Sequence, residues 1–152
     1  MQKQLKMKLF VLALCSIALN YSNAYSQIVS RMVITDNLSS SSKLTYGKPK
    51  PAEAKSEFFI TEEKGTQVLI YTDLLNDEVN AETFKLLFTA YKTGKEKEEW
   101  VDDRIIDVKK SSSYSLTAFN FFEEGSYRIT VCRNESRSKI LAEGMFQVKK
   151  ED

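Results

Sequence analysis

The chain has 152 residues, of which 42% are hydrophobic and 28% charged, a balance typical of one globular domain. It contains no histidine, which excludes the commonest general base, the commonest metal ligand and any Ser-His-Asp or Cys-His catalytic arrangement. P-loop, GxGxxG, HExxH and paired CxxC patterns are also missing from the sequence. We therefore predict no catalytic residue, no cofactor and no metal ligand.

A positively charged start followed by a short apolar run predicts that residues 1–24 are a secretory signal peptide. The apolar run, Leu9–Leu19, has about 11 residues, whereas a membrane-spanning helix needs roughly 20. We expect cleavage after Ala24, with Ser26 as the alternative site. The mature chain is then periplasmic or secreted and carries no transmembrane segment.

Cleavage removes three of the 22 basic residues and none of the 21 acidic ones, which leaves a net charge of −2. Such a charge gives no electrostatic footprint for nucleic acid or an anionic membrane, so we expect no nucleic-acid partner. The mature chain keeps 128 residues, enough to bury one hydrophobic core without disulfides.

The two cysteines have different contexts. Cys15 lies inside the apolar run and follows Leu14, which is too large for the position before a lipidated cysteine, so we expect no lipid anchor. Cys132 is the one cysteine of the mature chain and cannot form an internal disulfide. We treat it as a free thiol without a role. Its predicted strand places it on the face of Arg128 and Thr130, where it should be accessible unless that face is covered.

The mature chain reads as short strands joined by polar turns. The segment 25–56 is expected to hold one strand and a long polar loop, and 57–149 the core of the domain. The strand at 66–72 is apolar on both faces, which is typical of a central strand. Expected strands cover 28–35, 57–61, 66–72, 100–108, 114–122, 127–133 and 139–149, with the polar loop over 37–55.

Residues 80–94 allow two interpretations. Phe84, Leu87, Phe88 and Tyr91 follow the spacing of a helical stripe. A strand would instead place Phe84, Leu86, Phe88 and Ala90 on one face. We favour the strand, because the neighbouring segments are all strands.

The last expected strand is predicted to face the core through Ile140, Ala142, Phe146 and Val148. Gly144, in the middle of this strand, suggests a bulge. Seven or eight strands at spacings near ten residues are the sequence pattern of a β-sandwich or barrel.

The clearest motif is Gly125-Ser126-Tyr127, followed by alternating apolar residues. It resembles the entry to the penultimate strand of the immunoglobulin-like and fibronectin-III-like domains found in exported bacterial proteins. The resemblance implies an all-β, immunoglobulin-like two-sheet sandwich in which Gly125 makes the turn and Tyr127 the structural corner. Ile129 stands where antibody domains have a cysteine, so no disulfide between the sheets is expected.

Two functions from different classes fit these features. The first is an exported, non-enzymatic binding protein whose partner is a protein or a glycan of the cell envelope. Its candidate partner face consists of aromatic residues opposite the predicted core, Tyr71, Tyr91, Trp100 and Phe119. The alternative is a small exported glycan-active enzyme, which needs two carboxylates facing each other across a cleft. A third hypothesis is assembly by strand addition at a sheet edge.

Overall fold

The computed structural model describes residues 29–38, 53–60, 65–75, 83–94, 96–109 and 111–151. Within these ranges every helix or strand assignment is β-strand, which confirms the all-β prediction. The predicted signal peptide and most of the polar loop predicted over 37–55 lie outside the described residues. The strands are β1 (Val29–Thr35), β2 (Glu57–Ile60), β3 (Thr66–Leu74), β4 (Thr83–Thr93), β5 (Glu98–Lys109), β6 (Tyr114–Phe121), β7 (Gly125–Arg133) and β8 (Ser136–Lys150).

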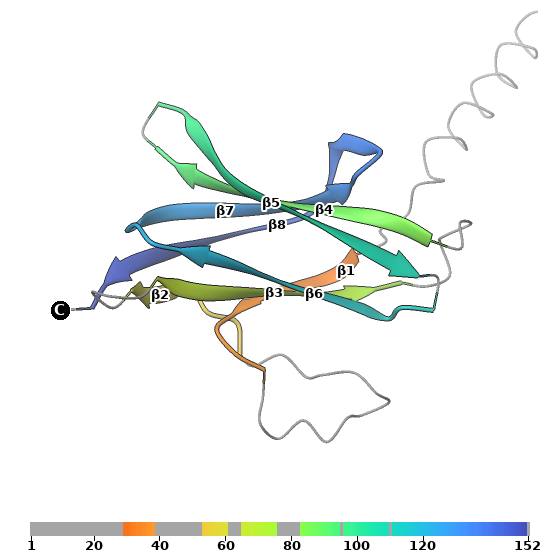
Figure 1. Ribbon diagram of the computed structural model, residues 1–152, viewed down its shortest axis with the longest axis horizontal. Helices are drawn as coiled ribbons and strands as arrows, with labels where there is room; N and C mark the ends of the chain where they lie inside the picture. Colours follow the sequence, from red (N-terminus) through yellow and green to blue (C-terminus); the bar gives the residue numbers. More distant parts are fainter. Residues whose placement is uncertain are drawn as a thin grey trace, which may run out of the picture.

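The strands form two sheets that pack face to face (Figure 1). The smaller sheet has the order β1-β3-β6 and the larger one β2-β8-β7-β4-β5. The chain crosses between the sheets from β3 to β4 and again from β6 to β7, as in immunoglobulin sandwiches. The fold is therefore an immunoglobulin-like two-sheet sandwich, as predicted. It differs from the four-plus-three constant-type arrangement because β5 stays beside β4 in the larger sheet.

Alternating side chains from both sheets fill the space between them. On β4, Phe84, Leu86, Phe88 and Ala90 point inward and are buried, so the strand expected over 83–92 is confirmed and the helical interpretation was wrong. β3 lies between β1 and β6, which confirms it as a central strand. The opposite wall of the core comes from the smaller sheet and includes Ile34, Val68, Ile70, Phe119 and Phe121.

The first two strands belong to different sheets. β1 pairs with β3 in the smaller sheet, whereas β2 runs parallel to β8 at the edge of the larger one. A hydrogen bond from the backbone N–H of Lys55 to the carbonyl of Ile34, 2.9 Å long, links the two segments. β1, the strand expected within the segment 25–56, thus contributes Val29 and Ile34 to the hydrophobic core.

A buried tyrosine fixes the corner between β6 and β7. The Tyr127 hydroxyl donates a hydrogen bond to the carbonyl oxygen of Glu123, 2.8 Å away. The Tyr127 ring lies 4.5 Å from that of Phe121 and is stacked 5.7 Å from that of Phe146. Gly125 has φ +152°, a conformation that favours glycine. The corner therefore joins the two sheets through both packing and a hydrogen bond.

The bulge in β8 is not at Gly144, as the sequence suggested. Gly144 lies in regular register with Ile129, and the shift comes earlier in β8, where the pairing skips Leu141. The skipped residue turns Ile140 to the outer face opposite Cys132, so the prediction that Ile140 faces the core was wrong.

Gly144 instead allows β1 to approach the larger sheet. A Cβ atom at this position would lie 2.7 Å from Ile34 Cδ1 and 2.9 Å from Met32 Cε. Both side chains come from β1, across the core from β8. The absence of a side chain at Gly144 thus leaves room for the inner face of β1.

Candidate interaction surface

The four aromatic residues predicted as a partner face lie in two different sheets. Tyr71 and Phe119 belong to the smaller sheet, and Tyr91 and Trp100 to the larger one. Phe119 is a buried core residue, with the Arg104 guanidinium 5.4 Å from the centre of its ring. The predicted single face was therefore wrong. Both faces of β6 carry apolar side chains, and Phe119 takes the inner one.

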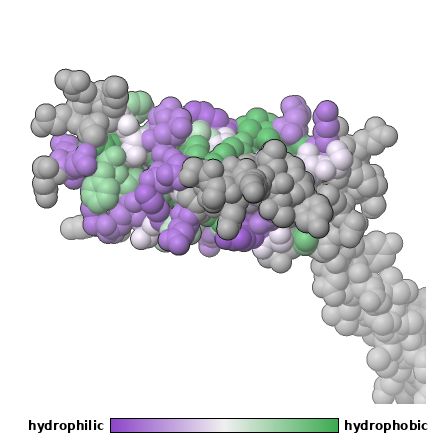
Figure 2. All heavy atoms as spheres, turned by 90° about the horizontal axis from the view of Figure 1, so that it is seen from below, coloured by the Kyte–Doolittle hydropathy of each residue, from purple (hydrophilic) through white to green (hydrophobic). Residues whose placement is uncertain are grey.

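Tyr71 does point away from the core, but it is buried. Its ring is stacked on that of Tyr114 at 5.7 Å, and its hydroxyl donates a hydrogen bond to Asp73 Oδ1, 3.1 Å away. Burial and the nearby Asp73 carboxylate raise the pKa of Tyr71 to about 12. On this side of the molecule, hydrophobic and hydrophilic residues are interspersed (Figure 2). Tyr71 is therefore not available to a partner in this conformation.

Tyr91 and Trp100 are cross-strand neighbours on the outer face of the larger sheet. The row continues in register through Arg128 on β7 to Met145 on β8. We name these four residues, Trp100, Tyr91, Arg128 and Met145, the outer row. Its ends are open to solvent, since Trp100 is 62% and Met145 63% exposed. Two large apolar side chains thus flank an arginine and a tyrosine on one open sheet face.

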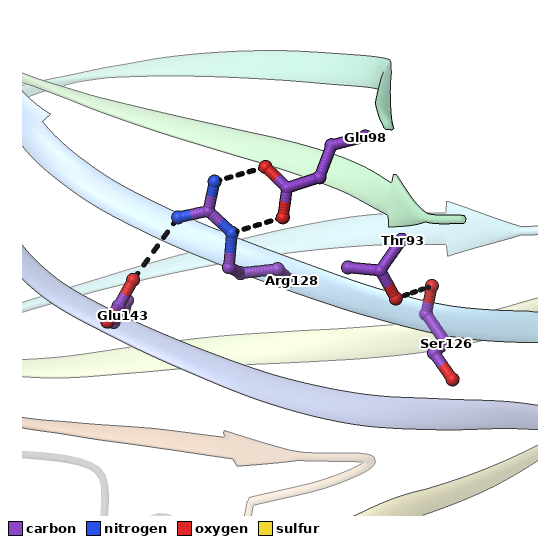
Figure 3. A network of polar contacts seen from close by, with 5 residues as sticks. All are labelled: Thr93, Glu98, Ser126, Arg128 and Glu143. Carbon is purple, nitrogen blue, oxygen red and sulfur yellow. Dashed lines mark hydrogen bonds and ion pairs between the residues drawn. The ribbon is translucent and has the colours of Figure 1, made fainter. Parts of the chain in front are cut away.

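Arg128 is held in place by carboxylates from β5 and β8, which lie on opposite sides of its own strand β7 (Figure 3). Its guanidinium donates two hydrogen bonds to Glu98, 2.7 and 2.5 Å long, and a third to Glu143, 3.2 Å long. The guanidinium carbon lies 5.1 Å from the centre of the Tyr91 ring, within cation–π range. The two-point contact with Glu98 fixes the plane of the guanidinium as well as its position.

The pKa values of this network move in the directions that favour the charged forms. The hydrogen bonds from Arg128 lower the pKa of Glu98, and those to Glu98 raise the pKa of Arg128. Both partners are partly exposed, so solvent screens the pair and its contribution to folding stability is small. The network therefore orients Arg128 more than it stabilises the fold.

Cys132 lies on the same face, but it is only 5% exposed, contrary to the accessible thiol expected from the sequence. The predicted strand phase is correct, because Tyr127, Ile129 and Val131 face the core. Cys132 is flanked in register by the larger residues Leu87 of β4 and Ile140 of β8. Burial raises the pKa of the Cys132 thiol, which disfavours the reactive thiolate.

The sequence did not identify Arg128 or Met145 as members of a surface. Alternation along β7 does place Arg128 outward, opposite the buried Tyr127. The register that brings Arg128 beside Tyr91 joins residues far apart in the chain, and the β7–β8 hairpin that brings Met145 beside Arg128 has two register shifts near its turn. No local pattern encodes those registers.

A second feature is an open cleft of about 290 Å³ at the end of the sandwich, which we name the end cleft. Two carboxylates line it, Glu99 and Glu123, as the glycan-active enzyme alternative requires. Lys92 Nζ donates a hydrogen bond to Glu123, 2.6 Å long, which lowers the pKa of Glu123 and keeps it ionised. A general acid needs the opposite shift, so Glu123 is not suited to that role.

Among the described residues, no group of three or more Cys, Asp and Glu side chains is arranged to hold a metal ion. The same part of the chain contains no helix long and apolar enough to cross a membrane.

No family model matches this chain, and no curated protein matches it significantly. Among solved structures, an immunoglobulin-like protein from Pseudomonas aeruginosa is similar, with a TM-score of 0.49 and 17% identity over 84% of this chain and 99% of that one. A β-glucosidase from Listeria innocua gives TM-scores of 0.36 and 0.39 in two structures, at 10% and 11% identity. The present chain covers 17% of the length of that enzyme. The fold assignment rests on the strand order and the tyrosine corner.

Proposed function

We propose that this chain is exported and acts as a non-enzymatic binding protein of the cell envelope or extracellular space, with a protein partner that packs on the outer row. The composition of the row carries the proposal. Trp, Tyr, Met and Arg are the residue types enriched in protein interfaces, and Trp, Tyr and Arg dominate the residues that contribute most binding energy. The row presents one of each, side by side across four strands.

The geometry of the row also favours binding. Glu98 and Glu143 already hold the Arg128 guanidinium, so less side-chain freedom is lost when a partner docks. Exposed Ile105 and Ile140 lie on the same face, beyond the polar row that contains Asp103 and Glu143. A partner that covers Trp100 and Met145 would remove two large apolar side chains from water.

A non-enzymatic role agrees with the composition and the electrostatics. The chain has no histidine, and the Lys92 ion pair lowers the pKa of Glu123 in the end cleft. The alternative glycan-active enzyme would need a carboxyl group with a raised pKa in that place.

Site-specific photo-crosslinking in cells of the source organism tests the proposal. A crosslinking residue replaces Gln147, which lies on the outer face beside Met145. The matched control replaces Gln67, an exposed glutamine on β3 of the smaller sheet. We expect one protein adduct of defined mass from position 147 and none from position 67.

The same adduct should disappear when Arg128→Ala or Trp100→Ala is added to the variant with the crosslinker at position 147. An adduct that forms equally from both positions, or that survives both substitutions, would contradict a role for the outer row. Failure to form any adduct at position 147 would do the same.

A further inference from the structure

The end cleft opens between the β4–β5 hairpin and the corner that joins β6 to β7. Its base is formed by Val101, by Phe121 and by the buried ring of the corner residue Tyr127. It is lined by Lys92, Glu99, Trp100, Val101, Asn120, Phe121, Phe122, Glu123 and Tyr127. Apart from Trp100, the cleft uses none of the outer row, so it is a separate candidate site.

Two exposed aromatic rings border the cleft. Trp100 is 62% and Phe122 73% exposed, which makes Phe122 the most exposed of the large apolar residues described. The Phe122 ring packs against the backbone of Gly65, where a Cβ atom would lie 2.6 Å from the ring. A glycine at this point thus allows an aromatic side chain to settle in an exposed position at the cleft.

Polar groups of both signs lie between the aromatic rings. The aliphatic part of Lys92 passes over Gly125, where a Cβ atom would lie 2.8 Å from Lys92 Cε, and its ammonium group reaches Glu123 at 2.6 Å. Glu99 adds a further carboxylate. The lining of the end cleft therefore provides both hydrogen-bond donors and hydrogen-bond acceptors.

This combination restricts the chemistry of a ligand. Because Lys92 is paired with Glu123, Glu99 leaves the lining with a net negative charge, which opposes an anionic ligand. A purely apolar ligand would desolvate the ion pair between Lys92 and Glu123 without replacing its contacts with water. A neutral ring that carries hydroxyl groups meets both requirements, because hydroxyls donate and accept, and the C–H faces of the ring pack on aromatic side chains.

We propose that the end cleft binds a neutral saccharide, with Trp100 and Phe122 against the sugar rings and Glu99 and the Lys92–Glu123 pair toward the hydroxyls. A volume of about 290 Å³ is at the lower end for ligand sites and suits one or two sugar units. Because the cleft is open, part of the ligand stays in water, and we expect a Kd on the order of 0.1–1 mM.

The chain has a single tryptophan, Trp100, so its fluorescence reports directly on this cleft. The test is a titration of the mature chain with cellotetraose, maltotetraose and chitotetraose, each up to about 10 mM, well above the expected Kd. At least one of them should give a saturable change in Trp100 emission and protect the indole from quenching by acrylamide.

Substitutions locate the binding. Phe122→Ala, at an exposed position, should weaken the saccharide response about tenfold, and Glu99→Gln should weaken it several-fold. Phe59→Ala is the matched control, because Phe59 is also an exposed phenylalanine but lies on β2, outside the lining of the cleft. It should leave the titration unchanged.

No response to any of the three saccharides would overturn the proposal, and so would a response that Phe122→Ala leaves intact. A response to arginine methyl ester but to no saccharide would show a cation site instead and would also overturn it. Protein adducts at position 147 are measured independently, so either proposal can fail while the other stands.

Discussion

Tyr127 illustrates how one hydroxyl contributes to the fold. It donates a hydrogen bond to the carbonyl of Glu123 while its ring packs between Phe121 and Phe146. Tyr127→Phe keeps the ring and leaves the carbonyl without its partner, which should cost about 1–3 kcal/mol. Thermal unfolding should show a Tm several degrees lower. Tyr114→Phe, whose ring stacks on Tyr71, is the control and should change Tm less; equal effects would contradict a corner role.

The ion pair with Arg128 should be measurable as a lowered pKa of the Glu98 carboxyl group. Arg128 lowers the pKa of Glu98 below its ordinary value of 4.5. The stabilisation of the folded protein by the Glu98–Arg128 pair is therefore complete above pH 4.5. It is lost as the pH falls through the lowered pKa of Glu98. Carboxyl ¹³C NMR should give a Glu98 midpoint below 4.5, which returns to the ordinary value in Arg128→Ala. A midpoint that Arg128→Ala leaves unmoved would show that Arg128 does not orient the carboxylate.

Cys132 should be unreactive in the folded protein. It is buried between the strand neighbours Leu87 and Ile140, and burial raises the pKa of its thiol. A thiol reagent such as DTNB should label the mature chain slowly under native conditions and rapidly in denaturant. Cys132→Ser, which lacks the thiol, gives the background. Fast labelling of the native chain, or a disulfide-linked dimer on mild oxidation, would show that the outer face opens at this point.

At the scale of strands, Gly144 controls how closely β1 approaches β8. A Cβ atom there meets the flexible ends of the Ile34 and Met32 side chains, which can move. Gly144→Ala should therefore change stability little. Gly144→Val adds two methyl groups to the same space and should cost about 1–3 kcal/mol in urea unfolding, the usual range for overpacking. If both variants unfold at the same urea concentration, β1 does not pack against this position.

Strand positions could be predicted from the sequence because alternation is local. In β4 the inward set Phe84, Leu86, Phe88 and Ala90 follows from the period of two once the segment is taken as a strand. In β6 the alternation of residues does not predict which face is buried, because both faces carry apolar side chains. Leu116 and Ala118 lie on one face, and Phe119 and Phe121 on the other. The larger aromatic pair occupies the core, and this depends on the opposite sheet.

The candidate site depends still more on distant residues. Tyr91 and Trp100 could be found as aromatic residues outside the core, and the hairpin between them made their pairing local. Arg128 and Met145 reach the same row only through the registers of β4 with β7 and of β7 with β8. A bulge that skips one residue, as at Leu141, exchanges the faces beyond it, so Ile140 could not be placed from the period of the strand.

At the scale of the whole molecule, the predicted removal of a signal peptide is compatible with the fold. The predicted cleavage after Ala24 or Ser26 would fall before Val29, where β1 begins, so the chain that remains would keep all of this strand. β1 packs Met32 and Ile34 against the core and pairs along β3. A cut inside β1 would expose the edge of β3 and the core beneath it.

Two measurements test this arrangement. Intact mass of the protein recovered outside the cytoplasm should correspond to a start at Tyr25 or within a few residues of it. A recombinant chain that starts at Tyr25 should unfold cooperatively, whereas one that starts at Asp36 lacks β1 and should be markedly less stable or aggregate through the uncovered edge of β3. Recovery of a full-length, membrane-embedded chain, or of a chain acylated at Cys15, would contradict the cleavage. Equal stability of the two recombinant chains would show that the sandwich does not need β1.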